Sequence, residues 1–340
     1  MKSRTLRLIL RELSRPRSIW ELIPRQDSHL EELHSIVGEL LKQGYLEVKE
    51  GKLSLTPKGR DLARDLGISH RREGFFETAR TRCVTLVSFL PEMKIYEMIA
   101  SRRPPIRAEF DQGYMRPKDV FFRLVVMYER GDLEGAEIAV LGDDDLLGIA
   151  LALTGLPRKV EVFEVDENIV EFENRIARQR DLKLEAHVYD FRRKLDGRWL
   201  SGFDTFVTDP VETIHGLKLT FSRGAAMLRD GGSGYFGLTR LESSLAKWRE
   251  VQRMLNEMNF AITDLYPNFS VYPLEGNIGS YLESCEVYRA FSSLSWPPDA
   301  DFYTSHLYRI EAVGRPKPLV APDEEMMEDI LHDEESWVTP

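Results

Sequence analysis

Short apolar runs alternate with segments of helical period between residues 137 and 239. The apolar runs predict strands at residues 137–141, 160–165, 187–188, 203–208 and 234–239. Between them, residues 146–153, 168–180 and 217–228 are expected to form helices, as their spacing of apolar positions indicates. Strands that alternate with helices pair in parallel through crossover connections. This part of the chain therefore predicts an α/β fold with a doubly wound sheet.

The first 72 residues follow a different pattern. Residues 5–13 and 28–43 repeat apolar positions at helical spacing, and Ser18 precedes Glu21, as Ser28 precedes Glu31, in the S-x-x-E spacing that caps a helix start. Residues 45–56 alternate apolar and polar positions around a Glu50-Gly51 turn, which predicts a hairpin. Three short helices followed by a hairpin resemble a winged helix-turn-helix module.

The exposed face of the helix expected at residues 28–43 argues against DNA binding. It carries Glu31, Glu32 and Glu39 against Lys42, so it would present carboxylates to phosphates. The hairpin is more basic, which leaves a DNA-binding regulator as an alternative. We expect instead a structural or dimerising module, and a homodimer that does not bind nucleic acid.

Length and composition indicate a soluble protein of more than one domain. The 340 residues, 42% hydrophobic and 30% charged, exceed what one core usually serves. We divide the chain into a module at 1–72, a catalytic domain at 73–315 and a flexible acidic tail at 316–340. No apolar run is long enough to span a membrane, and the N-terminal apolar stretch is too short for a secretory signal. A cytoplasmic location is expected.

The net charge of −10 is unevenly distributed. Residues 1–72 hold 15 Lys/Arg and 10 Asp/Glu, whereas residues 316–340 hold 1 Lys and 8 Asp/Glu. An acidic surface opposes non-specific nucleic-acid binding and is compatible with a cationic ligand. The two cysteines, 202 positions apart, form no metal-binding motif, and the histidines form none either, so no metal site is expected.

Acidic residues follow the predicted strands. Ligands of doubly wound sheets bind at the carboxyl ends of the strands, so these acids are expected to form the site. They are Asp143, Asp144 and Asp145 after Gly142, Glu164 and Asp166, Asp190, and Asp209 before Pro210. For Asp145 the alternative is a helix cap, and for Asp190 a turn residue.

The first strand–helix turn decides between cofactor classes. A dinucleotide site needs G-x-G-x-x-G there, so that backbone amides can approach a pyrophosphate. Here carboxylates follow Gly142 and would repel it, which disfavours NAD and FAD. A sulfonium cofactor without phosphate fits better, with Asp166 accepting from the ribose, Asp190 from the adenine amino group and Phe191 covering the ring.

Four strings carry a family resemblance. GDDDLLGIALALTG, VFEVDENIV, VTDPVET and FDQGYMRP, together with the N-terminal module, resemble the branched-chain polyamine synthases, or N4-bis(aminopropyl)spermidine synthases. That family is related to spermidine synthases and to S-adenosylmethionine-dependent methyltransferases, and the resemblance spans residues 1–315. It implies a Rossmann-like, methyltransferase-type domain. It also implies aminopropyl transfer from decarboxylated S-adenosylmethionine, as a co-substrate and not a tightly bound cofactor, to the secondary amine of spermidine.

The expected chemistry assigns roles to these acids. An attacking amine must lose a proton, and crowded carboxylates raise one another's pKa toward a useful value for a general base. We expect Asp143 or Asp144 to be that base and Asp209 to orient the nitrogen. The co-substrate side would comprise Gly142, Glu164, Asp166, Asp190, Phe191 and Pro210, and the amine side Asp145, Glu275, Asp111, Gln112 and Tyr114.

Several alternatives stay open. Glu275 precedes Gly276 and is equally compatible with an exposed turn. Met327, Ile330 and Leu331 have the spacing of a short amphipathic helix that would close over the amine site, but the tail is also compatible with a disordered, solubilising end. A methyltransferase would share the fold, although the Asp209-Pro210-Val211-Glu212 string lacks the aromatic residue typical of amine methylation.

Overall fold

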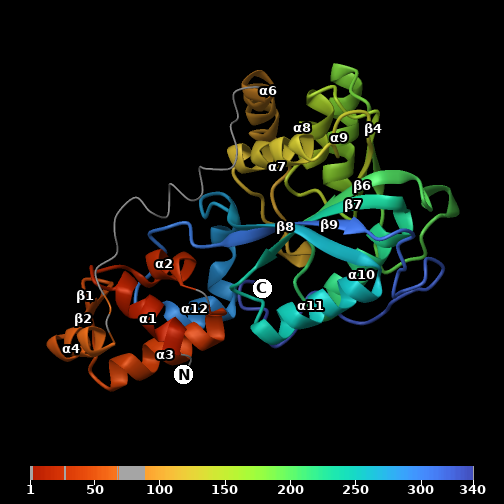
Figure 1. Cartoon of the computed structure of the whole chain (residues 1–340). Helices are drawn as coiled ribbons and strands as arrows, with labels where there is room; N and C mark the ends of the chain where they lie inside the picture. The colour runs from red at the N-terminus through yellow and green to blue at the C-terminus, as the bar shows by residue number, and fades with distance from the viewer. Residues whose placement is uncertain (1–2, 27, 67, 69–88, 340) are drawn as a thin grey trace.

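A seven-stranded sheet forms the centre of the protein (Figure 1). The computed structural model describes residues 3–26, 28–66, 68 and 89–339, so the boundary expected near residue 72 lies outside the described residues. The strand order is β5-β4-β3-β6-β7-β9-β8; β9 pairs antiparallel with both β7 and β8, and the other pairs are parallel. The strands are β3 (Glu137–Leu141), β4 (Lys159–Glu164), β5 (Leu184–Val188), β6 (Phe203–Thr208), β7 (Leu228–Thr239), β8 (Phe260–Val271) and β9 (Thr304–Ala312).

Helices cover both faces of this sheet, which makes it the mixed α/β, mostly parallel arrangement that the alternating pattern predicted. One face carries α6 (Leu90–Ala100), α7 (Pro117–Glu129), α8 (Leu147–Leu153) and α9 (Glu167–Arg180), and the other carries α10 (Ile214–Met227) and α11 (Leu245–Glu257). Strands β3 and β6 have the predicted bounds. A strand was expected before the loop at residues 272–277, where β8 ends, but β9, the antiparallel pairing of β8 with β9, and helices α6, α7 and α11 were not predicted.

The N-terminal module contains the predicted helices and hairpin. They are α1 (Ser3–Glu12), α2 (Ile19–Leu22), α3 (Leu30–Lys42), the antiparallel pair β1 (Leu46–Lys49) and β2 (Lys52–Leu55), and α4 (Pro57–Asp65). The capping box of Ser18 and Glu21 is confirmed. The expected box at Ser28 is wrong: α3 begins at Leu30, and the Ser28 amide donates to Gln26 Oε1 at 2.6 Å.

The module shares an apolar core with the part of the chain that contains the seven-stranded sheet. Trp20, fully buried, contacts Phe291 of α12 (Glu286–Phe291), Trp296 and Phe302. The same core includes Trp337 and Val338 near the C-terminus. The module is therefore packed onto the domain through large aromatic side chains.

Residues 316–339 pack along the catalytic domain as an extended segment. No helix forms at the expected Met327–Leu331 spacing. Arg223, fully buried in α10, donates to the carbonyl oxygens of Ala321 and Glu324 at 2.9 and 2.8 Å, and Lys247 of α11 pairs with Asp333 at 2.8 Å. The charge pattern had predicted a flexible acidic tail at these residues. In the structure, buried cations bind this acidic segment to the rest of the chain. None of the described helices combines the length and apolarity that a bilayer crossing requires.

Candidate active site

Two cavities meet at the carboxyl ends of the parallel strands. The first has a volume of about 660 Å³ and the second about 1190 Å³, counting the open space at their mouths. Their shared wall consists of Asp111, Asp144, Asp209, Pro210 and Leu331. Two ligands that fill the two cavities would therefore touch at a wall made largely of carboxylates.

Asp144 lies on that wall immediately after β3. Gly142, with φ of +72°, turns the chain out of the strand, and the Asp144 carboxylate accepts one hydrogen bond from the Gly113 amide at 2.7 Å. Burial, together with the charges of Glu164 and Asp209, raises the pKa of Asp144 to about 7, although the Gly113 amide opposes the shift. A carboxyl group with that pKa can accept and release a proton near neutral pH.

Asp209, at the end of β6, is held by a cation. Arg123 Nη2 donates to its two oxygens at 2.8 and 2.9 Å, and the Tyr272 hydroxyl donates to Oδ2 at 2.7 Å. Gly237 of β7 makes room for it, since a Cβ there would lie 2.1 Å from Asp209 Oδ1. Asp209 is therefore a fixed and charge-compensated acceptor.

The first cavity is lined by several carboxylates. Besides the shared wall, Glu212 and Glu242 line it, with the hydroxyl-bearing side chains of Tyr281 and Tyr303. Burial and the nearby Glu242 raise the pKa of Glu212 to about 7, and burial likewise raises that of Glu242. Tyr303 donates to Glu242 Oε2 at 2.6 Å. A ligand with several positive charges would relieve this crowding of carboxylates.

The second cavity is less polar and lies beside β4 and β5. Glu164, Phe191 and Thr220 line it, together with Gly142 and Asp190. Glu164 accepts from the backbone amides of Asp143 and Asp166 at 2.7 and 2.8 Å, which fixes its carboxylate at the strand end. Asp190 pairs with Arg192 instead of standing free. The size and mixed lining suit a nucleoside.

Three of the expected acids serve local structure. Asp143 accepts from the amides of Leu147 and Gly148 at 2.6 Å each, so it caps α8, the role considered earlier for Asp145. Asp166 caps α9 through the Asn168 amide at 2.9 Å. Asp145 accepts from the Met115 amide at 2.5 Å. All three are buried, and none of them lines either cavity.

The remaining expected amine ligands divide between the site and its surroundings. Asp111 lines both cavities, and Gln112 lines only the second, where its side chain donates to Asp166. Tyr114 lies outside both cavities and donates to the Gly276 carbonyl at 3.0 Å. Glu275 is exposed in the same turn.

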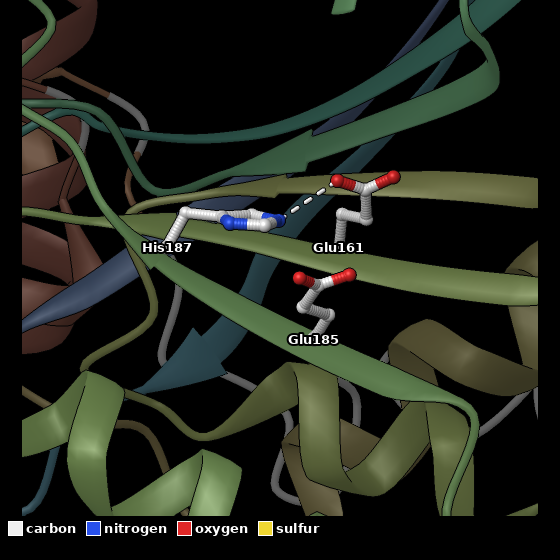
Figure 2. Close-up of side chains that lie close together, drawn as sticks. All are labelled: Glu161, Glu185 and His187. Carbon is white, nitrogen blue, oxygen red and sulfur yellow. Dashed lines mark hydrogen bonds and ion pairs between the residues drawn. The ribbon is translucent and has the colours of Figure 1, made fainter.

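Away from the cavities, the strands bring together one group of side chains with the spacing of metal ligands. Glu161, Glu185 and His187 lie on β4 and β5 (Figure 2). His187 Nε2 is 2.8 Å from Glu161 Oε2, and Lys159 Nζ is 2.5 Å from Oε1. Burial opposes ionisation of Glu161, but these two partners lower its pKa to about 2. Its charge is thus already compensated without an ion.

Comparison with known proteins identifies the family. A sequence profile of the branched-chain polyamine synthase A C-terminal domain matches residues 92–338. The chain belongs to the branched-chain polyamine synthase family. It is 34% identical to the N(4)-bis(aminopropyl)spermidine synthase of Thermococcus kodakarensis over 99% of this chain and 95% of that protein. The corresponding figures for the Thermus thermophilus synthase are 37%, 88% and 84%.

A relative of this chain has a crystal structure with two ligands bound. The crystal structure of the branched-chain polyamine synthase from Thermus thermophilus, in complex with N4-aminopropylspermidine and 5'-methylthioadenosine, superposes with a TM-score of 0.86 at 35% identity. The match covers 98% of this chain and 93% of that chain. The resemblance noted in the sequence is therefore confirmed over nearly the whole length of the synthase.

Sequence reasoning missed several residues of this synthase's acidic cavity. Glu242 follows β7, so the strand-end rule used for the first four strands would have found it had it been extended to the fifth. Glu212 stands three positions after Asp209 in the same string. Tyr303 and Arg123 carried no local signal: Tyr303 lines this cavity from the residue before β9, and Arg123 contacts its wall residue Asp209 from the middle of α7.

Proposed function

We propose that this synthase transfers the aminopropyl group of decarboxylated S-adenosylmethionine to the secondary amine of spermidine, giving N4-aminopropylspermidine and then N4-bis(aminopropyl)spermidine. The observation that carries the proposal is the shared carboxylate wall between an acidic cavity and a nucleoside-sized one. The Thermus thermophilus relative, bound to N4-aminopropylspermidine and 5'-methylthioadenosine, supports it.

The two substrates are assigned by chemistry. The nucleoside enters the second cavity, where Glu164 accepts from the ribose hydroxyls and Phe191 covers the adenine. Pro210 and Gly142 shape the wall, and Asp190 faces the base. We give the ribose role to Glu164 because Asp166 is committed to the cap of α9. The ammonium groups of spermidine enter the first cavity, where Asp111, Glu212 and Glu242 accept from them.

The transfer needs a neutral nitrogen. Asp144 takes one proton from the bound ammonium, and the nitrogen lone pair attacks the methylene carbon bound to the sulfonium. The carbon–sulfur bond breaks, its electron pair stays on sulfur, and 5'-methylthioadenosine leaves as a neutral thioether. Asp209 accepts from the substrate and holds the nitrogen in line with that bond. In a second turnover Asp144 takes the single N–H proton of the tertiary ammonium, and the freed lone pair attacks a second co-substrate to give the quaternary nitrogen of N4-bis(aminopropyl)spermidine. No N–H then remains for Asp209, which acts on this nitrogen through its negative charge.

The same wall favours the decarboxylated co-substrate. Intact S-adenosylmethionine carries a carboxylate on the carbon chain that points from sulfur toward the amine. At the junction that carboxylate would meet Asp111, Asp144 and Asp209 at close range, with Arg123 already engaged by Asp209. Like charges in a partly desolvated site repel strongly. Methyl transfer from the intact cofactor is correspondingly disfavoured.

Product analysis tests this function. The purified protein is incubated with spermidine and with either form of the cofactor, and the polyamines are weighed by mass spectrometry. We expect the mass of the polyamine to increase by aminopropyl groups with the decarboxylated form only, and 5'-methylthioadenosine to form in equimolar amount. An increase by methyl groups with the intact form would contradict the proposal and indicate a methyltransferase.

For the N-terminal part, we propose a winged-helix-type module with a structural role. Its helix α3 buries Leu30, Leu33 and Val37 against the shared core, while Glu31 and Glu39 face outward. Residues 316–339 form part of the roof of the amine cavity through Leu331 and Thr339. A homodimer remains our prediction for the assembly, to be measured by sedimentation equilibrium, and the cytoplasm for its location.

A further inference from the structure

Arg123 is a buried cation beside a site that we assign to polycations. It lies in α7 with 1% of its surface exposed, and Nη2 makes its three hydrogen bonds, two to Asp209 and one to Ser270 Oγ at 3.0 Å. Helix α7 is itself tied to the sheet, since Asp119 accepts from the Val271 amide at 3.0 Å. The guanidinium is therefore fixed in position.

A structural ion pair elsewhere in the same sheet shows how different this arrangement is. Arg309 pairs with Asp132 and the Tyr235 hydroxyl, and its Nε, Nη1 and Nη2 atoms all have partners. Arg123 has the same kind of carboxylate and tyrosine partners, but its buried Nε has none. Burying a charge with an unpaired donor costs stability, so packing alone does not explain Arg123.

Asp144 and Asp209, two of the three carboxylates at the cavity junction, have different hydrogen-bond partners. Asp209 has a guanidinium on its oxygens, whereas among the described residues the hydrogen bond to Asp144 comes from the neutral Gly113 amide, and Arg103 acts on it through its charge alone. We propose that Arg123 is a positioning residue for aminopropyl transfer, which keeps Asp209 a charged, immobile acceptor so that the proton of the attacking amine passes to Asp144. This inference rests on the proposed function.

The surroundings of Asp209 make Arg123 its main source of positive charge. Arg123 faces it from α7, the Tyr272 hydroxyl from the end of β8, and Asp144 and Asp145 from the turn after β3. Without Arg123, three carboxylates would crowd one another, and Asp209 would compete with Asp144 for the amine proton. The nitrogen would then lose its oriented acceptor whenever Asp209 bound that proton.

The test compares Arg123→Gln and Arg123→Lys with Arg309→Gln, the matched control at a buried pair outside the site. The pH dependence of kcat/KM is measured for each variant by release of 5'-methylthioadenosine. For Arg123→Gln, the acid side of the profile is expected to move to higher pH and to steepen from one proton to two. A move of about one pH unit along a two-proton limb lowers kcat/KM at pH 7 by about 100-fold. Arg123→Lys is expected to restore part of the shift.

Arg309→Gln is expected to lower the melting temperature and leave the profile in place. An unshifted profile in Arg123→Gln, with only a lower melting temperature, would overturn the proposal. If Arg123→Gln does not fold, the double variant Arg123→Gln/Asp209→Asn removes both charges. We expect it to fold with a one-proton profile and a reduced kcat; wild-type kcat in that double variant would also overturn the proposal. Failure of the wild-type protein to make any aminopropyl product would instead contradict the proposed function.

Discussion

Replacement of Asp144 by Asn tests the assignment of the general base most directly. The change removes the proton acceptor and keeps the size of the side chain, and its carbonyl oxygen can still accept from the Gly113 amide at 2.7 Å. General bases contribute about 10²- to 10⁴-fold. We therefore expect kcat/KM for spermidine to fall by about that factor in Asp144→Asn.

The wild-type pH profile supplies a second, independent measure. Asp144 must be charged to accept a proton, and burial raises its pKa to about 7. Below that pH, kcat/KM is expected to fall about tenfold per unit, over a range in which aliphatic amines stay protonated. The assay follows 5'-methylthioadenosine release between pH 5.5 and 8, a range chosen to bracket about pH 7. The Asn variant is expected to lose this dependence.

Asp145→Asn is the matched control, because Asp145 is the adjacent acid but lines neither cavity. We expect it to keep the pH dependence of the wild type, with a lower stability. Loss of activity in Asp145→Asn, combined with near-normal activity in Asp144→Asn, would refute the assignment. It would show that substrate binding turns the third carboxylate of the string toward the amine.

Further variants test other parts of the synthase. Glu242→Gln removes a charged acceptor from the first cavity, so KM for spermidine is expected to rise about 10- to 100-fold, the equivalent of about 1.5–3 kcal/mol, while KM for the co-substrate stays unchanged. Gly237→Ala places a Cβ 2.1 Å from Asp209 Oδ1 and is expected to lower kcat strongly; wild-type kcat would show that Asp209 can move. Trp20→Ala opens the shared core and should cost about 3–5 kcal/mol in urea unfolding; a loss below about 1 kcal/mol would mean that the module is loosely packed. The raised pKa of Glu212, about 7, means that its neutral form stabilises the fold at low pH and that this contribution is lost as pH rises through 7. The wild type should therefore lose more melting temperature between pH 5 and 8 than Glu212→Gln does, and equal losses would contradict this.

The inner parallel strands of the sheet could be predicted because they are buried on both faces. β3 is a nearly continuous apolar run, β6 carries Phe203, Phe206 and Val207 among polar residues, and the bounds of both followed directly from the sequence. The bounds of β8 could not be predicted, because it is an edge strand with mostly exposed or half-buried positions. Its pairing with β9 also shifts register between Tyr266 and Ser270. A strand without alternation leaves no periodic signal.

The candidate site divided in the same way. The sequence predicted that acids would lie together at the carboxyl ends of the parallel strands, because the topology of the sheet places these ends at one edge. Which side chains enter the cavities depends on neighbours far away in sequence. Glu164 reaches the second cavity while Asp166, two positions on, turns back to cap α9. Glu275, a carboxylate expected to bind the amine, lies in an exposed turn.

The consecutive acids of the Gly-Asp-Asp-Asp string show why residue type alone does not fix chemistry. Asp143 accepts from two amides of α8, Asp144 from one amide of a distant loop, and Asp145 from another. Three identical side chains thus differ in the donors that meet them and in their access to the cavities. Asp144 lines both cavities and accepts a hydrogen bond from the neutral Gly113 amide. Its basicity is therefore a property of the loop at Gly113 as much as of the string itself, and changes in that loop should alter the pH profile without touching an acid.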